Sequence, residues 1–232
     1  MKKLLLGIAA VCLAGFTFAQ DAPLWMRHSV ISPDGTTIAF TYKGDIYTVP
    51  VAGGRAMQIT TNPAYDTAPV WSPDSKRIAF ASDRMGSLDV YIVAKDGGEP
   101  RRLTTHSGSE TPLAFTDAGH VLFSAGIMPS AEAVVFPSNG QFNQVYRVSV
   151  EGGRPTMISS MPMECISINK EGAMLYQDKK GYEDYWRKHH VSPIARDIWM
   201  YTPGKEPQYR QLTTFGGEDR EPVWACLLYT SD

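Results

Sequence analysis

The sequence has little of what marks several common protein classes. It contains only three cysteines, Cys12, Cys165 and Cys226, which are too few for a disulfide framework or a cysteine-based zinc site. Lys and Arg number 22 against 24 Asp and Glu, so no excess of positive charge favours binding to nucleic acid or to an anionic membrane. After residue 16, no apolar run approaches the roughly 18 residues of a membrane-spanning helix.

Local motifs for catalysis are also missing from the sequence. It contains no Gly-x-Ser-x-Gly, His-Glu-x-x-His, Gly-x-Gly-x-x-Gly or phosphate-binding loop motif. We therefore predict no catalytic, cofactor-binding or metal-binding residue in this chain, and no cofactor. His189-His190 is the one adjacent histidine pair. Neighbouring side chains of an extended segment point to opposite sides, whereas zinc needs three or four converging ligands, so we interpret this pair as a packing or hydrogen-bonding feature.

The two ends of the chain differ from the rest. Two lysines precede an apolar stretch at residues 4–16, and the small residue Ala19 follows at the position of a cleavage site. We therefore expect residues 1–19 to be a signal peptide that directs export to the periplasm or out of the cell. Residues 225–232 interrupt the repeat described below, so we expect them to be a non-native tail and residues 20–224 to form the folded part.

Most of the chain consists of one pattern written several times. Its fixed point, called the anchor residue below, ends a short first strand and precedes a turn. The anchor residues are Ile31, Trp71, Phe115, Ile168 and Trp224. Their spacing of about 40 to 56 residues is the sequence signature of a repeat architecture.

Each copy of the pattern contains the same local signals. The turn after the first anchor, Ser32–Gly35, combines Pro, Asp and Gly, whose dihedral preferences and side-chain hydrogen bonds favour a tight turn. A short apolar second strand follows, and then a third strand in which apolar and polar residues alternate. The third strands are expected at residues 45–49, 89–93, 144–148 and 197–201. Gly-Gly turns at 53–54, 97–98 and 152–153, with Pro203-Gly204 in the last copy, lead into fourth strands.

A four-stranded unit of this length is typical of the blade of a β-propeller. One small sheet cannot bury both of its faces, so every blade must repeat the residues that pack against its neighbours. We therefore predict an all-β fold, a β-propeller of four-stranded antiparallel blades with four complete blades and the start of a fifth. A β-sandwich is the alternative fold, but sandwiches do not repeat one four-strand pattern at this spacing.

Individual residues of the repeat also have predicted places. We expect the anchor Trp71 to be buried between blades and Asp74 to be exposed in its turn. Asp45, Asp89 and Asp197 begin third strands. They could act as cation ligands, but we favour a structural interpretation in which each carboxylate accepts backbone N–H groups of a nearby turn.

Two loop segments allow both a functional and a structural interpretation. Asp83-Arg84 could contact another blade or a peptide, but we favour a solvated pair that contributes at most about 1 kcal/mol. The insertion at residues 127–137 is unusually apolar for a loop. We expect it to pack against another part of the protein, because exposed apolar segments mark interfaces.

The Ser-Pro-Asp-Gly turn, the Ile-Ala-Phe strand and the Asp-Ile-Tyr strand resemble the propeller repeats of TolB, of tricorn-type proteases and of prolyl-oligopeptidase relatives. The third and fourth copies contain insertions between their second and third strands. The insertion at residues 180–199, KGYEDYWRKHHVSPIARDIW, is similar to a segment of exported bacterial tricorn-like peptidases. The resemblance covers residues 23–224.

This resemblance implies an exported serine peptidase in which one or two propellers precede a PDZ domain and a catalytic core related to tail-specific proteases. It further implies a peptide or unfolded protein as substrate, a propeller that gates or docks that substrate, and contacts with the PDZ and catalytic domains or with further copies of the chain. The catalytic Ser and His of the family belong to that core, so none is assigned in this chain. A TolB-like binding module without activity and a prolyl-oligopeptidase-type hydrolase remain the alternatives.

Overall fold

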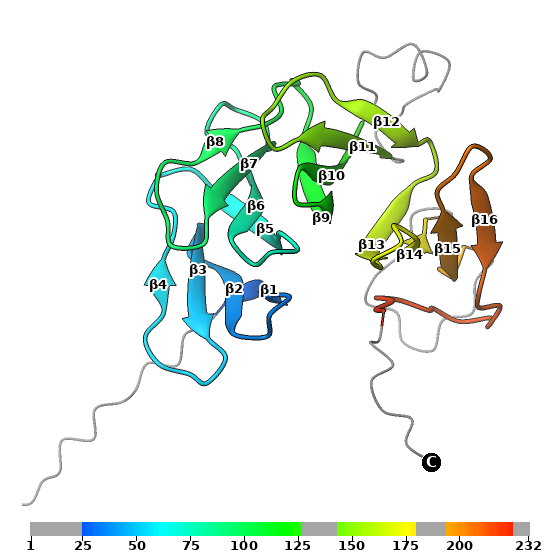
Figure 1. The fold of residues 1–232 in the computed structure, drawn as a ribbon, viewed down its shortest axis with the longest axis horizontal. Helices are drawn as coiled ribbons and strands as arrows, with labels where there is room; N and C mark the ends of the chain where they lie inside the picture. Colours follow the sequence, from blue (N-terminus) through cyan, green and yellow to red (C-terminus); the bar gives the residue numbers. More distant parts are fainter. Residues whose placement is uncertain (1–24, 127–142, 180–193, 225–232) are drawn as a thin grey trace, which may run out of the picture.

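Four antiparallel sheets of four strands each follow one another around a common axis (Figure 1). The computed structural model describes residues 25–126, 143–179 and 194–224, and the structural statements below refer to these residues. Within these ranges all regular elements are strands, and no helix is long and apolar enough to cross a membrane. The strands of every sheet pair in chain order, which confirms the prediction of a β-propeller with four complete blades.

Each blade is a meander whose first strand faces the axis and whose fourth strand lies at the periphery (Figure 1). Blade 1 contains β1 (Arg27–Ile31), β2 (Thr37–Tyr42), β3 (Asp45–Pro50) and β4 (Met57–Gln58). Blade 2 contains β5 (Asp66–Trp71), β6 (Arg77–Ser82), β7 (Asp89–Ala94) and β8 (Arg101–Arg102). Blade 3 contains β9 (Glu110–Asp117), β10 (His120–Ala125), β11 (Gln144–Ser149) and β12 (Thr156–Ser159). Blade 4 contains β13 (Met163–Ile168), β14 (Met174–Asp178), β15 (Ile198–Thr202) and β16 (Gln208–Gln211).

The turn after each anchor is held by the residues that the sequence pattern singles out. In blade 1, Asp34 Oδ1 accepts the Thr36 backbone N–H at 3.0 Å and the Ser32 hydroxyl at 2.5 Å. Gly35 adopts a φ of 71°, a left-handed conformation that glycine reaches without strain. In blade 2 the same position is Ser75, which adopts a φ of 57° without being glycine.

A β-bulge interrupts the pairing of the first and second strands in every blade. Three residues before the anchor, blades 1, 2 and 4 place a non-glycine residue in the left-handed region. These residues are His28, Ala68 and Cys165, with φ of 50°, 51° and 51°. No residue type marks the bulge, so the sequence pattern did not predict it.

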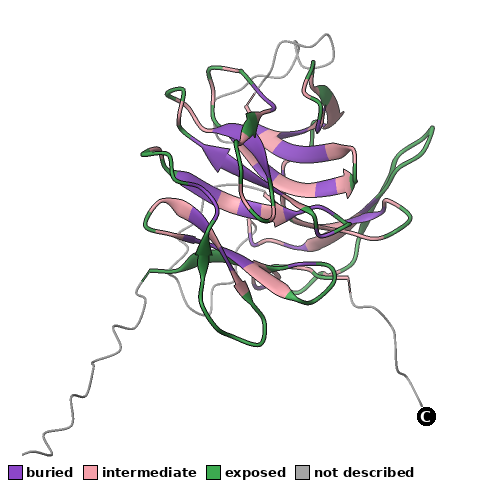
Figure 2. Ribbon diagram, turned by 60° about the vertical axis from the view of Figure 1, so that its left-hand side comes forward, coloured by how far each residue is buried: buried purple, intermediate pink, exposed green. Residues whose placement is uncertain are grey.

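The core consists of three clusters, and each cluster spans two neighbouring blades. At the first two seams a stacked aromatic pair of the later blade packs on small and aliphatic residues of the earlier one. Phe80 and Tyr91 of blade 2, with ring centroids 5.9 Å apart, lie against Ala39 and Ile46 of blade 1. Figure 2 shows buried residues concentrated in the strands and exposed residues in the loops between them.

Trp71 lies in the seam between blades 1 and 2, as predicted. It is 8% exposed, and its indole N–H donates to the Val30 carbonyl of blade 1 at 3.2 Å. Asp74 is exposed in its turn, also as predicted. The anchor side chain therefore joins two blades, while the polar turn residue faces solvent.

Candidate functional site

The inner strands of all four blades line a cavity of about 990 Å³ along the axis of the arc. Because β1, β5, β9 and β13 are the first strands of their sheets, the side chains that point away from the blade cores gather there. The lining is largely apolar and includes Ile31, Val70, Phe115, Ile168 and Val223. Ile31 is 58% exposed, so this apolar surface is open to a ligand.

The polar groups of this axial cavity are not arranged for nucleophilic chemistry. Cys165 is exposed, but partial desolvation raises the pKa of its thiol, and the nearby Glu221 and Glu164 carboxylates act in the same direction, so the reactive thiolate is disfavoured. Burial alone would raise the pKa of Asp117, but hydrogen bonds from His120 and the Gly119 amide outweigh it and hold the pKa below its usual range. The cavity therefore offers an apolar surface with fixed charges, suited to binding.

The buried serines next to the cavity serve the turns. Ser72 Oγ donates to Asp74 Oδ1 at 2.5 Å and accepts the Arg77 backbone N–H at 2.9 Å. Ser32 makes the matching bonds in blade 1. These hydroxyl protons are committed to carboxylates within two residues, so neither serine is poised as a nucleophile.

The aspartates that begin the third strands are structural, but their partners differ from the prediction. Asp45 accepts from the side chains of Gln58 at 3.0 Å and Thr60 at 3.3 Å, and Asp89 pairs with Arg102 at 2.8 Å. Asp197 accepts from the Gln211 amide at 3.0 Å. For Asp45 and Asp89 the predicted backbone acceptor role was wrong, because the side chains of Gln58, Thr60 and Arg102, in the fourth strand or just after it, bond to these carboxylates instead.

The prediction of a solvated Asp83-Arg84 pair was also wrong. Arg84 Nη2 lies 2.8 Å from Asp66 Oδ2, and the two side chains are only 11% and 0% exposed. The guanidinium also lies over the rings of Phe80 and Tyr91. Asp83 instead accepts the Tyr65 backbone N–H at 2.7 Å, so each residue of the dipeptide fixes a different part of the loop.

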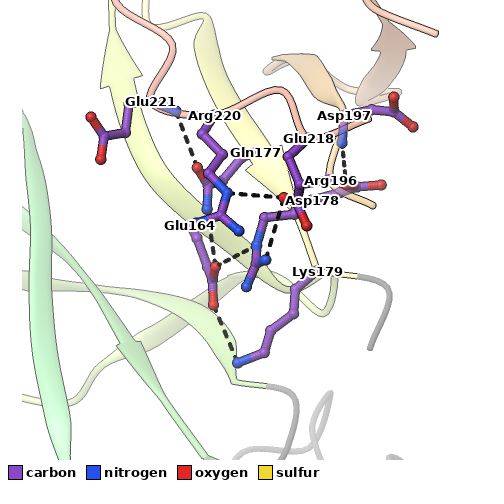
Figure 3. A network of polar contacts seen from close by, with 9 residues as sticks. All are labelled: Glu164, Gln177, Asp178, Lys179, Arg196, Asp197, Glu218, Arg220 and Glu221. Atoms are coloured by element: carbon purple, nitrogen blue, oxygen red, sulfur yellow. Dashed lines mark hydrogen bonds and ion pairs between the residues drawn. The ribbon is translucent and has the colours of Figure 1, made fainter. Parts of the chain in front are cut away.

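A network of charged residues surrounds β13 to β15 at the edge of blade 4 (Figure 3). Glu164 accepts from Lys179 at 3.2 Å, Arg196 at 3.3 Å and Gln177 at 3.1 Å. Burial would raise the pKa of Glu164, but these partners outweigh it and lower the pKa. Glu218 links Arg196 at 3.5 Å to Arg220 at 2.9 Å. The network thereby ties the segment after β16 to blade 4.

That segment repeats the contact that joins blades 1 and 2. The Trp224 indole N–H donates to the Ser167 carbonyl of β13 at 3.0 Å. Trp71 makes the equivalent bond to Val30 of β1. Glu221, three residues before this anchor, has the left-handed φ of 54° found at the same place in blades 1, 2 and 4.

The backbone at the start of the segment repeats a second contact between blades. The Asp219 N–H donates to the Arg196 carbonyl at 2.9 Å. Asp66 and Glu110 make the same bond to the residue that precedes β3 or β7 of the blade before them. Although residues 219–224 are not paired as a strand in the described structure, they take the position and contacts expected for the start of a fifth blade.

The three acidic residues at this position, Asp66, Glu110 and Asp219, were missed in the sequence analysis. Each lies five residues before an anchor, and this recurrence is the signal that could have identified them. His189-His190 and the insertion at 127–137 lie outside the described residues. Among the described residues, no group of three or more His, Cys, Asp or Glu side chains is placed to hold a metal ion.

Comparison with known proteins identifies the family to which the chain is similar. The model of the family described as the tricorn protease N-terminal β-propeller domain matches residues 23–232. The chain is 25% identical over 204 residues to Tricorn protease homolog 1 of Streptomyces coelicolor, which covers 88% of this chain and 18% of that protein. It is 30% identical over 129 residues to the uncharacterized peptidase YuxL of Bacillus subtilis, covering 55% of this chain and 20% of the relative. The chain thus spans about a fifth of the length of these relatives.

A shorter sequence match and two structural matches agree with the propeller fold. The chain is 44% identical over 55 residues to the Tol-Pal system protein TolB of Bordetella pertussis, which is 23% of this chain and 13% of that protein. The crystal structure of the tricorn protease superposes with a TM-score of 0.67 at 19% identity, over 88% of this chain and 20% of that one. A TolB structure from Agrobacterium tumefaciens gives 0.57 at 21% identity, over 84% and 69%. Since the family match extends over both ends of the described propeller, this chain belongs to the tricorn protease N-terminal β-propeller family.

Proposed function

We propose that this chain is the substrate-handling propeller of an exported serine peptidase of the tricorn type. The observation that carries the proposal is the family match from residue 23 onward, together with an open apolar cavity formed by the inner strands of every blade. An extended peptide presents alternating side chains to a surface of this kind without needing a specific sequence. The propeller would admit or dock such a chain before cleavage.

Catalysis in this proposal belongs to a core elsewhere in the protein. There a serine activated by a histidine would attack the peptide carbonyl, and backbone N–H groups would stabilise the oxyanion. The described serines support this division: the hydroxyls of Ser32 and Ser72 are bonded to turn carboxylates, and Ser167 in the cavity lining accepts the Trp224 backbone N–H. Residues 20–224 alone are therefore expected to hydrolyse no peptide.

The gating role is tested by narrowing the cavity in the full-length protein. Ile31→Arg would place a long charged side chain among apolar lining residues, whereas Val51→Arg changes an exposed apolar residue in the turn after β3, outside the lining. We expect Ile31→Arg to lower kcat/KM for an unstructured protein much more than for a short fluorogenic peptide. Val51→Arg should leave kcat/KM for both substrates unchanged. Equal losses on the two substrates would contradict gating.

Two alternatives follow from particular similarities. The TolB match favours a propeller that binds a partner protein and catalyses nothing. The YuxL match is to an uncharacterized peptidase, and we propose a prolyl-oligopeptidase-type hydrolase as the second alternative. Labelling of the full-length protein with a serine-reactive fluorophosphonate separates them. A labelled serine in a tail-specific-protease core supports the main proposal, one in a Gly-x-Ser-x-Gly motif supports the hydrolase, and an inert full-length protein supports the binding module.

We also propose that the chain is exported and cleaved before Gln20, because residues 1–19 have the charged, apolar and small-residue regions of a signal peptide. The mass of the mature N-terminal peptide, measured on protein from the periplasmic or secreted fraction, tests this proposal. An intact Met1 in that fraction would contradict cleavage.

A further inference from the structure

Pairs of acidic side chains recur where one blade meets the next. One member begins the third strand of the earlier blade, and the other begins the first strand of the later blade. The pairs are Asp45 with Asp66 at the first seam and Asp89 with Glu110 at the second. At the third seam the equivalent residues are the uncharged Gln144 and Met163. The acidic pairs are therefore not required to build a seam.

The pair at the second seam is the most deeply buried. Asp89 and Glu110 are both 0% exposed. Arg102 Nη2 lies 2.8 Å from Asp89 Oδ2 and is the cation paired with these two carboxyl groups. At the first seam, by contrast, Arg84 pairs with Asp66 while the partly exposed Asp45 receives bonds from Gln58 and Thr60.

Hydrogen bonding leaves one oxygen of Glu110 without a donor. The Thr104 hydroxyl accepts the Val90 backbone N–H at 2.8 Å and donates its proton to Glu110 Oε2 at 3.0 Å. Among the described residues, Glu110 Oε1 and Asp89 Oδ1 receive no hydrogen bond. A buried carboxylate oxygen in this position is costly unless a proton or a donor reaches it.

The His106 ring lies beside Glu110 Oε1, with its Nδ1 3.5 Å away. The same Nδ1 accepts the Gly108 backbone N–H at 3.0 Å, so in this arrangement it carries no proton of its own. Two acceptors therefore face one another across 3.5 Å. A proton on Glu110 Oε1 would turn this unfavourable contact into a favourable one.

Among the described residues, no other charged group around the pair supplies a second positive charge. Arg84, in the loop after β6, is already paired with Asp66 of β5. Tyr91 of β7 has its pKa raised by burial, so it stays neutral beside Asp89. On β10, the residue opposite Glu110 is Ala125. The described part of the seam thus holds two carboxyl groups, one arginine and a histidine whose Nδ1 faces Glu110 as an acceptor.

We propose that Glu110 is protonated at neutral pH and that the Asp89–Glu110 pair acts as a pH-sensitive latch between blades 2 and 3. With one proton, the seam contains one carboxylate balanced by Arg102, and Glu110 can donate its acid hydrogen to Asp89 or to the His106 ring. When that proton is lost, the second buried negative charge has no cation of its own among the described residues, and repulsion between the two carboxylates weakens the seam between blades 2 and 3.

The titration of Glu110 supports this geometry. Burial raises its pKa to about 8, the Asp89 charge acts in the same direction, and the Thr104 hydrogen bond and Arg102 oppose the rise. The unfolded chain titrates near the ordinary value of 4.5, so the folded state binds more protons between these limits. Stability from this group is therefore complete below about pH 4.5 and is lost as pH rises to about 8.

The first experiment compares the full chain with Glu110→Gln in denaturant titrations from pH 5 to pH 9. Glutamine keeps the shape of the protonated acid but cannot lose the proton. The unfolding equilibrium constant of the wild type should rise relative to that of Glu110→Gln by up to about tenfold per pH unit between pH 5 and about 8, and should level off above that pH. Equal pH profiles for the two proteins would overturn the proposal.

Glu164→Gln is the matched control, because Glu164 is a partly buried glutamate whose ion pairs lower its pKa. This variant should lose stability at all neutral pH values and keep the wild-type slope between pH 5 and 9. A second variant, Asp89→Asn, removes the neighbouring charge and should shift the Glu110 titration to lower pH. Burial remains in that variant, so the midpoint should still exceed the ordinary value.

Direct observation of the proton keeps the test independent of folding yield. In protein labelled with ¹³C at glutamate side chains, the signal that Glu110→Gln removes should titrate well above the other glutamates. The protection factor of the Glu110 amide, which donates to the Leu88 carbonyl at 2.6 Å, should fall at alkaline pH in the wild type only. A Glu110 signal that titrates with the ordinary glutamates would overturn the latch.

Discussion

At the scale of single residues, the same side chain takes different partners in different blades. The threonine hydroxyl after the fourth strand accepts the backbone N–H at the start of the third strand in blades 1, 2 and 4. In blade 1 this hydroxyl donates to Asp45 of its own blade, and in blade 2 it donates to Glu110 of the next. The same threonine hydroxyl therefore either bonds within its own blade or links that blade to the next one.

The anchor residue and the turn residue should differ sharply in their contribution to stability. Trp71 is buried in a seam, so Trp71→Ala is expected to cost about 3–5 kcal/mol of unfolding free energy. Asp74→Ala removes exposed turn bonds and should cost about 1 kcal/mol or less. Denaturant titration of both variants checks the prediction, and equal losses would show that Trp71 is not a seam residue.

At the scale of elements, the bulge of the inner strand determines how each blade bends. In blades 1, 2 and 4 it inserts one extra residue and places a residue in the left-handed region, where a β-carbon is strained. In blades 1, 2 and 4 the bulge recurs although histidine, alanine and cysteine occupy the position in turn. The surrounding pairing and the next blade must therefore impose it against local preference.

Replacing each of two alanines by glycine tests this strain. Ala68 lies at the bulge with a φ of 51°, whereas Ala79 is fully buried in the regular strand β6. Ala68→Gly should leave stability nearly unchanged or raise it slightly, because relief of strain offsets the added chain entropy. Ala79→Gly loses a buried methyl group as well as entropy and should cost about 1–2 kcal/mol. Thermal and urea unfolding of the two variants would contradict the strain if Ala68→Gly were the more damaging.

The sequence predicted the elements that carry local signals and missed those that depend on distant contacts. Pro, Asp and Gly in the turns and the alternation of the third strands have local physical causes, so the blades lay where expected. The partner of Arg84 is Asp66, and the partner of Glu110 is Asp89, both about 20 residues away in the chain. Such pairings arise only when strands are brought together, and no local preference encodes them.

At the scale of the whole molecule, the face of blade 1 that points away from blade 2 differs from the faces buried between blades. Blade 1 carries the stacked pair Phe40–Tyr47 on the side away from blade 2, with ring centroids 5.8 Å apart, beside a groove of about 590 Å³. The equivalent pairs Phe80–Tyr91 and Phe123–Tyr146 are covered by the preceding blade. The face of blade 1 therefore has the composition of a seam without the described neighbour that the other seams have.

This difference predicts that replacing the equivalent tyrosine by alanine destabilises the protein more in blade 2 than in blade 1. Tyr91 is 5% exposed, whereas Tyr47 is only half-buried at the groove. Tyr91→Ala should cost about 3 kcal/mol or more, because it opens a cavity in a seam. Tyr47→Ala should cost roughly 1–2 kcal/mol in the 232-residue chain. Urea unfolding of both variants measures the gap, and a larger loss for Tyr47→Ala would mean that the groove is already filled.

The pairing of every sheet in chain order has a consequence for the way the protein acquires its structure. No strand of the four described sheets requires a partner from a remote part of the sequence, and each blade contacts mainly the blades before and after it. Contacts that are local in sequence form quickly and can propagate from unit to unit. A chain that emerges gradually from the ribosome can therefore fold blade 1 before blade 4 has been synthesised. Each folded blade then provides the apolar surface against which the next blade packs.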